Sequence, residues 1–314
     1  MSIQSLFRRF HETIQLKRFS ENAELREKRD RILKRLRDNM SHSFEPFNQG
    51  SYAMGTGIKP LNGDYDIDVG IVLDDVDYRR HQPVEVKRWV YEAVLGHTTR
   101  VEWRRPCITV YYQQSGEALY HVDLAIMAKD AYGTLRLALG KEHSSLDQQE
   151  WQVDDRAGFM EAVENRFTGE DAFQFRRVIR YLKRWKDVHF SSEGHAAPTG
   201  LSITAAALRW FQPRKTHSYT SVDYDDLAAT ASLVRSIQQG FTQIYSPNQG
   251  RYVLRLQFQF PNAPYDDVFR RMTDQQMQEF HQRLEKLSGW LEDARRTQST
   301  APLRRAFGQD FPDS

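Results

Sequence analysis

Two acidic residues, Asp66 and Asp68, alternate with apolar residues in the segment 65–69 (YDIDV). Successive side chains of a β-strand point to opposite faces, so the two carboxylates leave the same face. Held that close, they repel each other, and one would take up a proton unless a multivalent cation lay between them. Hard oxygen ligands suit Mg²⁺, or Mn²⁺, which completes its shell with water and substrate phosphates. The pattern therefore predicts a divalent-metal site.

A third carboxylate fits the same chemistry. Asp123 stands in a segment that is otherwise apolar around it, and a two-metal site uses a third acid for the ion that activates the attacking hydroxyl. The alternative is an edge-strand aspartate on a solvated face. Asp64 shares the parity of the upstream pair, so Asp64 and Asp66 form a rival pair; we prefer Asp66 with Asp68 because apolar residues flank both. His121 shares the parity of Asp123 and is either its supporting partner or a structural histidine.

Gly50 and Ser51 precede the acidic strand. A Gly-Ser turn can offer backbone N–H groups and a hydroxyl to a phosphate, although the dipeptide is common in any loop. Its place before the carboxylates strengthens the phosphate interpretation. A phosphate grip followed by a two-carboxylate metal site is typical of nucleotidyl transfer.

A basic helix is predicted around residues 176–190, where Lys183 and four other cations surround an apolar stripe. Most of these charges are expected on a solvated face. At least one should face the substrate, because a site that handles a triphosphate needs a counter-charge besides Mg²⁺.

The composition limits the function classes. The 314 residues carry 44 Lys and Arg against 42 Asp and Glu, a formal charge of +2, so nucleic acid is not required as a partner. The single cysteine, Cys107, excludes an intramolecular disulfide and a multi-cysteine zinc site, and is most simply a small buried apolar residue. No apolar run approaches the roughly 18 residues of a membrane span, and the N-terminus lacks a signal-peptide pattern. We expect a cytoplasmic protein that does not bind membranes.

The predicted elements divide the chain into an N-terminal part, residues 1–165, and a helical part, residues 166–314. Residues 3–40 contain neither Gly nor Pro and show helical apolar spacing, which predicts one long amphipathic helix, followed by a break over 41–48. The other predicted elements are strands at 66–73, 101–112 and 119–127, helices at 83–95, 200–211, 222–240 and about 269–291, and a short strand in VLRLQF (253–258). The pattern predicts an α/β (α+β) fold with a mixed sheet, a second helical lobe and an active site in the cleft between them.

The motifs together resemble the DNA polymerase β-like nucleotidyltransferase superfamily and, within it, the bacterial CD-NTases related to cyclic GMP-AMP synthase and oligoadenylate synthase. The resemblance rests on Gln49-Gly50-Ser51, on the segment 65–69, on Asp123 between Val122 and Leu124, and on the segments 179–186 and 198–202. The polar Gln49 departs from the apolar residue of the family motif.

This resemblance implies a role for each site residue. Asp66 and Asp68 would hold both metal ions together with Asp123, which would orient the nucleophilic hydroxyl. Gly50 and Ser51 would hold the γ-phosphate. Lys183, with either Thr199 or Ser202, would hold the rest of the triphosphate, and the long N-terminal helix would be the spine that joins both lobes.

The resemblance also implies an activity: synthesis of a cyclic oligonucleotide, with a dinucleotide as the expected product, from ATP with ATP, GTP or UTP. The product would be a second messenger for a downstream effector in anti-phage defence (CBASS). A DNA activator is not expected, because one cysteine cannot build the zinc insertion of the DNA-sensing animal enzyme. A linear polymerase, or a nucleotidyltransferase acting on an RNA or protein acceptor, is the alternative, and the near-zero net charge argues against its basic groove. A non-catalytic nucleotide-binding module need not retain three convergent carboxylates.

Overall fold

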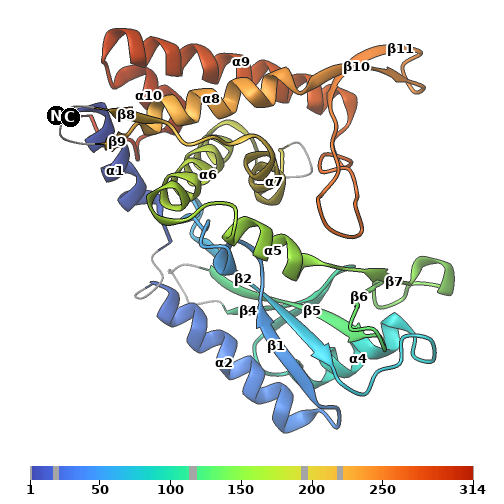
Figure 1. The fold of residues 1–314 in the computed structure, drawn as a ribbon. Helices are drawn as coiled ribbons and strands as arrows, with labels where there is room; N and C mark the ends of the chain where they lie inside the picture. Colours follow the sequence, from blue (N-terminus) through green and yellow to red (C-terminus); the bar gives the residue numbers. More distant parts are fainter. Residues whose placement is uncertain (1, 17–20, 113–118, 192–196, 218–221, 314) are drawn as a thin grey trace.

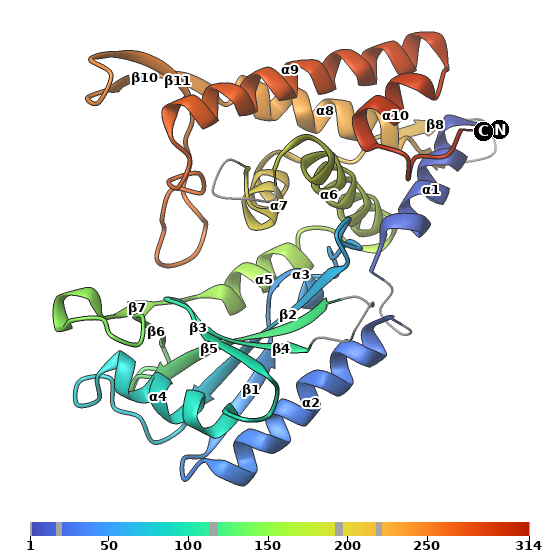
Figure 2. The same ribbon diagram turned by 180° about the vertical axis from the view of Figure 1, so that it is seen from behind.

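The computed structural model describes residues 2–16, 21–112, 119–191, 197–217 and 222–313. A sheet-containing lobe and a helical lobe lie one above the other (Figure 1). Helix α5 (Arg156–Glu164) lies between the sheet and the helical lobe, as the view from behind also shows (Figure 2). The α/β class with a mixed sheet and a helical lobe is confirmed.

The sheet of the first lobe has seven strands among the described residues, with β1, β2, β5, β4 and β3 side by side in that order and β6 and β7 continuing from β5. Strands β2 and β5 are parallel, and the other pairs are antiparallel. The strands are β1 (Phe44–Asn48), β2 (Asp64–Leu73), β3 (Arg100–Trp103), β4 (Ile108–Tyr112), β5 (Leu119–Lys129), β6 (Leu135–Leu139) and β7 (Glu150–Val153).

One face of this sheet packs against helices α2 (Glu21–Asn39) and α4 (Pro83–Val94). Ile67, Val69 and Val122 share one buried cluster with Leu25 and Ile32 of α2. Because side chains alternate along a strand, the even-numbered residues of β2 leave the opposite face, on the side of α5. The sheet therefore turns its acidic residues toward the helical lobe.

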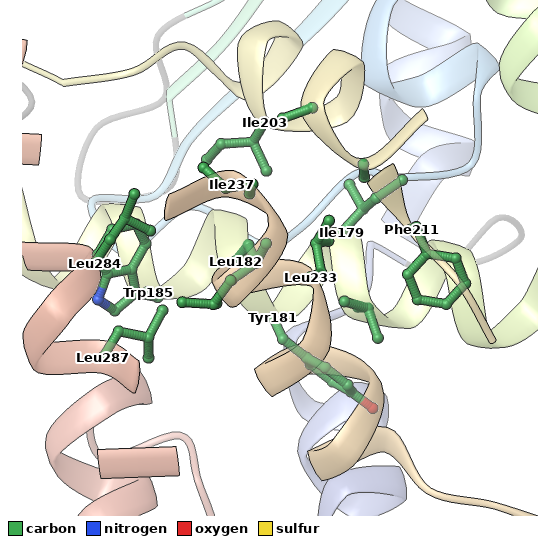
Figure 3. Close-up of a cluster of buried hydrophobic side chains, with 14 of the residues drawn as sticks. Ile179, Tyr181, Leu182, Trp185, Ile203, Phe211, Leu233, Ile237, Leu284 and Leu287 are labelled. Carbon is green, nitrogen blue, oxygen red and sulfur yellow. The ribbon is translucent and has the colours of Figure 1, made fainter. Parts of the chain in front are cut away.

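The second lobe buries a large apolar core between its helices. Leu182 and Trp185 of α6 belong to one buried cluster with residues from other helices, including Leu284 and Leu287 of α9 (Figure 3). The remaining elements are the helices α1 (Ile3–Ile14), α3 (Gly50–Ala53), α6 (Gly169–His189), α7 (Gly200–Trp210), α8 (Asp226–Gln239), α9 (Asp274–Thr297) and α10 (Ala301–Phe307), the 3₁₀ turn η1 (Leu146–Gln148), and the short strands β8 (Lys215–His217), β9 (Val222–Tyr224), β10 (Phe241–Ser246) and β11 (Arg251–Leu256).

The N-terminal segment differs from its prediction, because it forms two helices and not one. Helix α1 ends at Ile14, and Gln15 has extended backbone that pairs with Ile58. The apolar stripe of α1 packs into the core of the helical lobe, whereas that of α2 packs under the sheet. Because the two halves of the segment pack into two separate cores, the prediction of one long helix was wrong. The boundary predicted between residues 165 and 166 stays a prediction.

Other predicted elements hold with smaller changes. The predicted strands 66–73 and 119–127 and helix 83–95 correspond to β2, β5 and α4. The predicted strand 101–112 is a pair of antiparallel strands, β3 and β4. The break predicted over 41–48 contains strand β1, where Pro46 is tolerated because β1 lies at the edge of the sheet. None of the helices in the described ranges has the length and apolar character that a membrane crossing requires.

Candidate active site

The parallel pairing of β2 with β5 brings the predicted carboxylates together. Asp68 lies directly opposite Asp123, and Asp66 lies opposite His121. Ile67 and Val122 are buried on the other face of the sheet, so the three aspartates share the face toward the helical lobe. The alternation in the sequence therefore arises because these side chains share one face of the sheet. We call Asp66 and Asp68 of β2, together with Asp123 of β5, the acidic row.

Burial and mutual repulsion raise the pKa values of two carboxylates on this face. Burial, followed by the charges of Asp66 and Asp123, raises the pKa of Asp68 to about 7. Burial also raises the pKa of Asp66, and Asp123 and Asp64 add to the effect while His121 and Lys183 oppose it. The Asp66 residue is nevertheless open to water on this face. A divalent cation would offset this repulsion directly.

The donor set fits Mg²⁺. Within the described ranges no group of three or more His, Cys, Asp and Glu side chains forms a ready-made metal cage. Mg²⁺ does not require one, because it is usually held by one or two carboxylates together with water and substrate phosphates. Two adjacent carboxylates with raised pKa values provide such a partial shell. The assignment of Asp66, Asp68 and Asp123 as metal ligands stays a prediction.

The rival acid, Asp64, has a partner of its own. Its Oδ1 lies 2.9 Å from His121 Nδ1, which also gives the histidine a partner other than Asp123. Asp123 is bound from its other side, where Thr109 Oγ1 donates to Asp123 Oδ1 over 2.6 Å. These contacts favour Asp66 with Asp68 over Asp64 with Asp66.

Gly50 lies against the carboxylate of Asp68. Its φ of +66° is in the left-handed region, and a Cβ there would overlap Asp68 Oδ2. Ser51 follows directly, and its carbonyl accepts from Thr56 N over 2.9 Å. A glycine is therefore needed for the close approach that sets Ser51 beside the acidic row; phosphate binding by Gly50 and Ser51 stays a prediction.

Most basic residues of α6 are buried, contrary to the expected solvated face: Arg177, Arg180, Lys183 and Arg184. Arg180 donates to the carbonyls of Gly55 and Gly57, and Lys183 donates to both Thr56 O (3.1 Å) and Thr56 Oγ1 (3.0 Å). Arg184 donates to Lys59 O over 2.8 Å. Three cations of the helical lobe thus hold the segment 55–59 that follows Ser51. The prediction that most of these charges lie on a solvated face was wrong, because this segment covers Arg180, Lys183 and Arg184.

Lys183 is nonetheless electrostatically linked to the acidic row. Burial, followed by the charges of Arg180 and Lys186, lowers its pKa to about 7, and Asp66 opposes the fall. A buried ammonium that faces two neutral oxygens of Thr56 would gain from an anionic partner.

Part of the sequence matches a known family. Residues 45–127 match the family model described as "Cyclic GMP-AMP synthase DncV-like, nucleotidyltransferase domain". This part of the chain is similar to a DncV-like nucleotidyltransferase domain. The matched range extends from β1 to β5 and contains Gly50, Ser51, Asp66, Asp68 and Asp123.

Solved structures share the fold of this chain over nearly its whole length. The Bradyrhizobium diazoefficiens CD-NTase CdnG in complex with GTP is 16% identical, with a TM-score of 0.72 over 97% of this chain and 95% of that one. Vibrio cholerae DncV cyclic AMP-GMP synthase is 15% identical, with a TM-score of 0.71 over 96% and 93%. CdnC of E. coli MS115-1 with ATP is 17% identical, with a TM-score of 0.68 over 99% of both chains.

The hydroxyls at the start of α7 are not equivalent. Ser202 is buried, and its Oγ donates to Val268 O over 3.1 Å. Thr199 is the exposed N-cap of the helix and accepts from Ser202 N over 2.9 Å. A Cβ at Gly200 would lie 3.4 Å from Lys183 Cε, so the helix start adjoins the lysine. Between the two predicted phosphate ligands, the geometry favours Thr199.

Sequence reasoning missed two residues that support the candidate site. Gln49, noted as a polar departure from the motif, is buried, and its Oε1 accepts from Arg156 Nη1 over 3.0 Å. The charge of Arg156 in turn opposes the raised pKa of Asp68. The second is Thr109, which contacts Asp123 from the neighbouring strand. The polar residue before Gly50 could have drawn attention to Gln49, whereas a single threonine in a strand gives no sign of a role in the site.

This site is identified by the chemistry of its side chains and not by the volume of a cavity. One hollow of about 680 Å³ lies between α5 and the segment around Asn262, and another of about 580 Å³ lies at the far end of β2 and β5. None of the three predicted catalytic aspartates lines either hollow.

Proposed function

We propose that the protein joins nucleoside triphosphates into a cyclic oligonucleotide, a dinucleotide in the simplest case. The proposal rests on one observation above all: Asp68 and Asp123 are opposite each other in parallel strands, with Asp66 on the same face and Gly50 against Asp68. This arrangement suits the activation of a hydroxyl beside a bound triphosphate. The family match and the fold shared with cyclic nucleotide synthases support the same function.

The donor triphosphate is assigned to the side of Gly50, Ser51, Lys183 and Thr199. Ser51 would donate its hydroxyl to the γ-phosphate, and the Lys183 ammonium would exchange its bonds to Thr56 for phosphate oxygens. Thr199 would add a second hydroxyl from the start of α7. These groups would hold the α-phosphate in line with the acidic row.

In each transfer, a ribose hydroxyl oxygen attacks the α-phosphorus of the donor, a new phosphodiester bond forms, and the bond to pyrophosphate breaks. The carboxylate of Asp123 would orient the attacking hydroxyl and draw away its proton. Asp66 and Asp68 would hold Mg²⁺, which supplies charge stabilisation for the hydroxyl and the phosphates when bound.

Ring closure requires the linear intermediate to turn round in the same site. Holding both ends near one acidic row makes the second transfer effectively unimolecular, so closure can outrun elongation. The net charge of +2 argues against a long basic groove for a polymer acceptor. In this proposal the soluble product acts on a downstream effector in anti-phage defence.

The substrates can be identified directly. Each radiolabelled NTP would be incubated with the protein alone and in pairs, followed by phosphatase. We expect labelled, phosphatase-resistant product with ATP and one partner among ATP, GTP and UTP. No transfer with any NTP pair would refute the proposal.

Activity should require Mg²⁺ or Mn²⁺. The reason is an all-oxygen donor set, so chelator should abolish turnover and zinc should not restore it. Duplex DNA should not stimulate the enzyme, since a chain with one cysteine cannot form a multi-cysteine zinc module. Product formation measured with each metal, and with and without DNA, tests both points; a many-fold rise with DNA would contradict the second.

Lys183→Ala should weaken NTP binding about tenfold to a hundredfold, because a lost charge-assisted phosphate contact costs about 1.5–3 kcal/mol. Lys186→Ala is the matched control on the same helix, since Lys186 pairs with Asp187 at 2.5 Å and not with the segment 55–59. Arg184→Ala should also bind NTP more tightly than Lys183→Ala, since Arg184 contacts Lys59 O and Asp310. Titration calorimetry with a non-hydrolysable ATP analogue measures the difference, and equal small effects at the three positions would remove Lys183 from the triphosphate site.

A further inference from the structure

Strand β4 supplies one fully buried hydroxyl to the acidic row. Thr109 lies directly opposite Asp123 in the antiparallel pair of β4 and β5, and neither its backbone nor its side chain reaches solvent. Its neighbours Ile108 and Val110 belong to the apolar cluster on the other face of the sheet. Thr109 therefore points to the same side as Asp123.

The contact between the two side chains has a defined direction. A carboxylate can only accept, so Thr109 Oγ1 donates to Asp123 Oδ1 over 2.6 Å, the short distance of a charge-assisted bond. The Cys107 thiol lies 3.7 Å from the same hydroxyl oxygen. Burial raises the pKa of Cys107 to about 12, so the thiol keeps its proton and does not compete with Asp123 as an anionic acceptor. The hydroxyl proton is thus committed to one carboxylate oxygen.

We propose that Thr109 is a positioning residue for Asp123, fixing the rotation of the carboxylate so that Oδ2 is presented to the acceptor hydroxyl and its metal ion. The inference rests on the proposed function, and it concerns how Asp123 is oriented. A threonine is well suited to this role, because its β-branched side chain is restricted at χ1 and holds the hydroxyl in one place. Partners that orient a metal-binding carboxylate typically change metal affinity or activity about tenfold to a hundredfold when removed.

The decisive comparison is Thr109→Val against Thr109→Ser. Valine keeps the shape and removes the hydroxyl, and serine keeps the hydroxyl. We expect Thr109→Val to lower kcat about tenfold to a hundredfold with little change in KM for NTP, and Thr109→Ser to retain most of the wild-type kcat. Thr230→Val is the matched control, since Thr230 is also fully buried and its hydroxyl donates to Asp226 O over 2.7 Å, in the helical lobe.

A second readout does not depend on turnover. Mn²⁺ binding would be followed by electron paramagnetic resonance in the presence of a non-hydrolysable ATP analogue, and Thr109→Val should bind Mn²⁺ about tenfold more weakly than Thr109→Ser. If Thr109→Val does not fold, Thr109→Ala against Thr109→Ser provides the same comparison. Wild-type kcat and Mn²⁺ affinity in the variant without a hydroxyl would overturn the inference. An inactive wild-type protein would instead refute the proposed function, while the Mn²⁺ comparison would still test Thr109.

Discussion

Replacing both Asp66 and Asp68 with Asn should abolish product formation while the protein remains folded. The two carboxylates are predicted to hold the metal, whose charge stabilisation is worth several kcal/mol, so we expect a loss of at least about a thousandfold. Turnover of radiolabelled NTP measures the loss. Asp64→Asn is the control, because Asp64 pairs with His121 and should cost much less. Wild-type turnover in the double variant would contradict the catalytic assignment.

The same double variant should gain stability at high pH. The pKa of Asp68 is raised to about 7 in the folded state. Ionisation of Asp68 therefore lowers the free energy of unfolding progressively as the pH rises from the unfolded-state pKa of an aspartate toward about 7. Asn cannot ionise and escapes this cost. Melting temperatures without divalent metal should therefore be higher in the variant than in wild type at about pH 8, with a smaller difference at about pH 5. A variant that is less stable than wild type at about pH 8 would mean that the repulsion is absent.

Asp226→Ala should destabilise the helical lobe strongly. Asp226 is fully buried, accepts two bonds from Arg177 (2.7 and 2.9 Å), and accepts others from Tyr181 and Gln174. Removing one partner of a buried pair leaves the other charge uncompensated, which costs about 3–5 kcal/mol. Chemical denaturation should show this loss in the free energy of unfolding.

The control for this network is Asp293→Ala, which removes an exposed pair with Arg296 and should change stability by less than about 1 kcal/mol. Burial alone would raise the pKa of Asp226, but the hydrogen bonds and charge of Arg177 hold it below its usual value. The stabilisation is therefore present above the usual aspartate pKa and is lost as the pH falls through the lowered one. Equal effects of the two substitutions would show that the buried network contributes little.

The acidic row could be predicted because it breaks a local pattern. Two acids alternating with Ile and Val, and a third acid in another apolar strand, conflict with simple core burial and so indicate a site. Their partners could not be predicted, since the pairing of β4 with β5 that brings Thr109 to Asp123 is a long-range contact. Threonine is also ordinary in strands, so its presence there carries no signal.

The helical predictions failed where tertiary contacts override local patterns. Nothing in residues 3–40 resembles a helix breaker, yet Gln15 pairs with Ile58, and Lys59 N donates to Ile14 O over 2.8 Å. Likewise, the charges on α6 predict exposure, but Arg180 and Arg184 are buried because the backbone carbonyls of the segment 55–59 accept their hydrogen bonds. The sequence shows that a side chain is charged, but it does not show which hydrogen-bond partner a distant segment provides in the fold.

The proposed cyclisation is tested most directly by mass spectrometry of the product after phosphatase treatment. A cyclic product has no terminal phosphate, so we expect a species that resists phosphatase and has the mass of a closed ring. The closure would take place at Asp66, Asp68 and Asp123, where the free hydroxyl of the linear intermediate meets its own triphosphate. A ladder of phosphatase-sensitive linear oligomers without any cyclic species would contradict the proposed function.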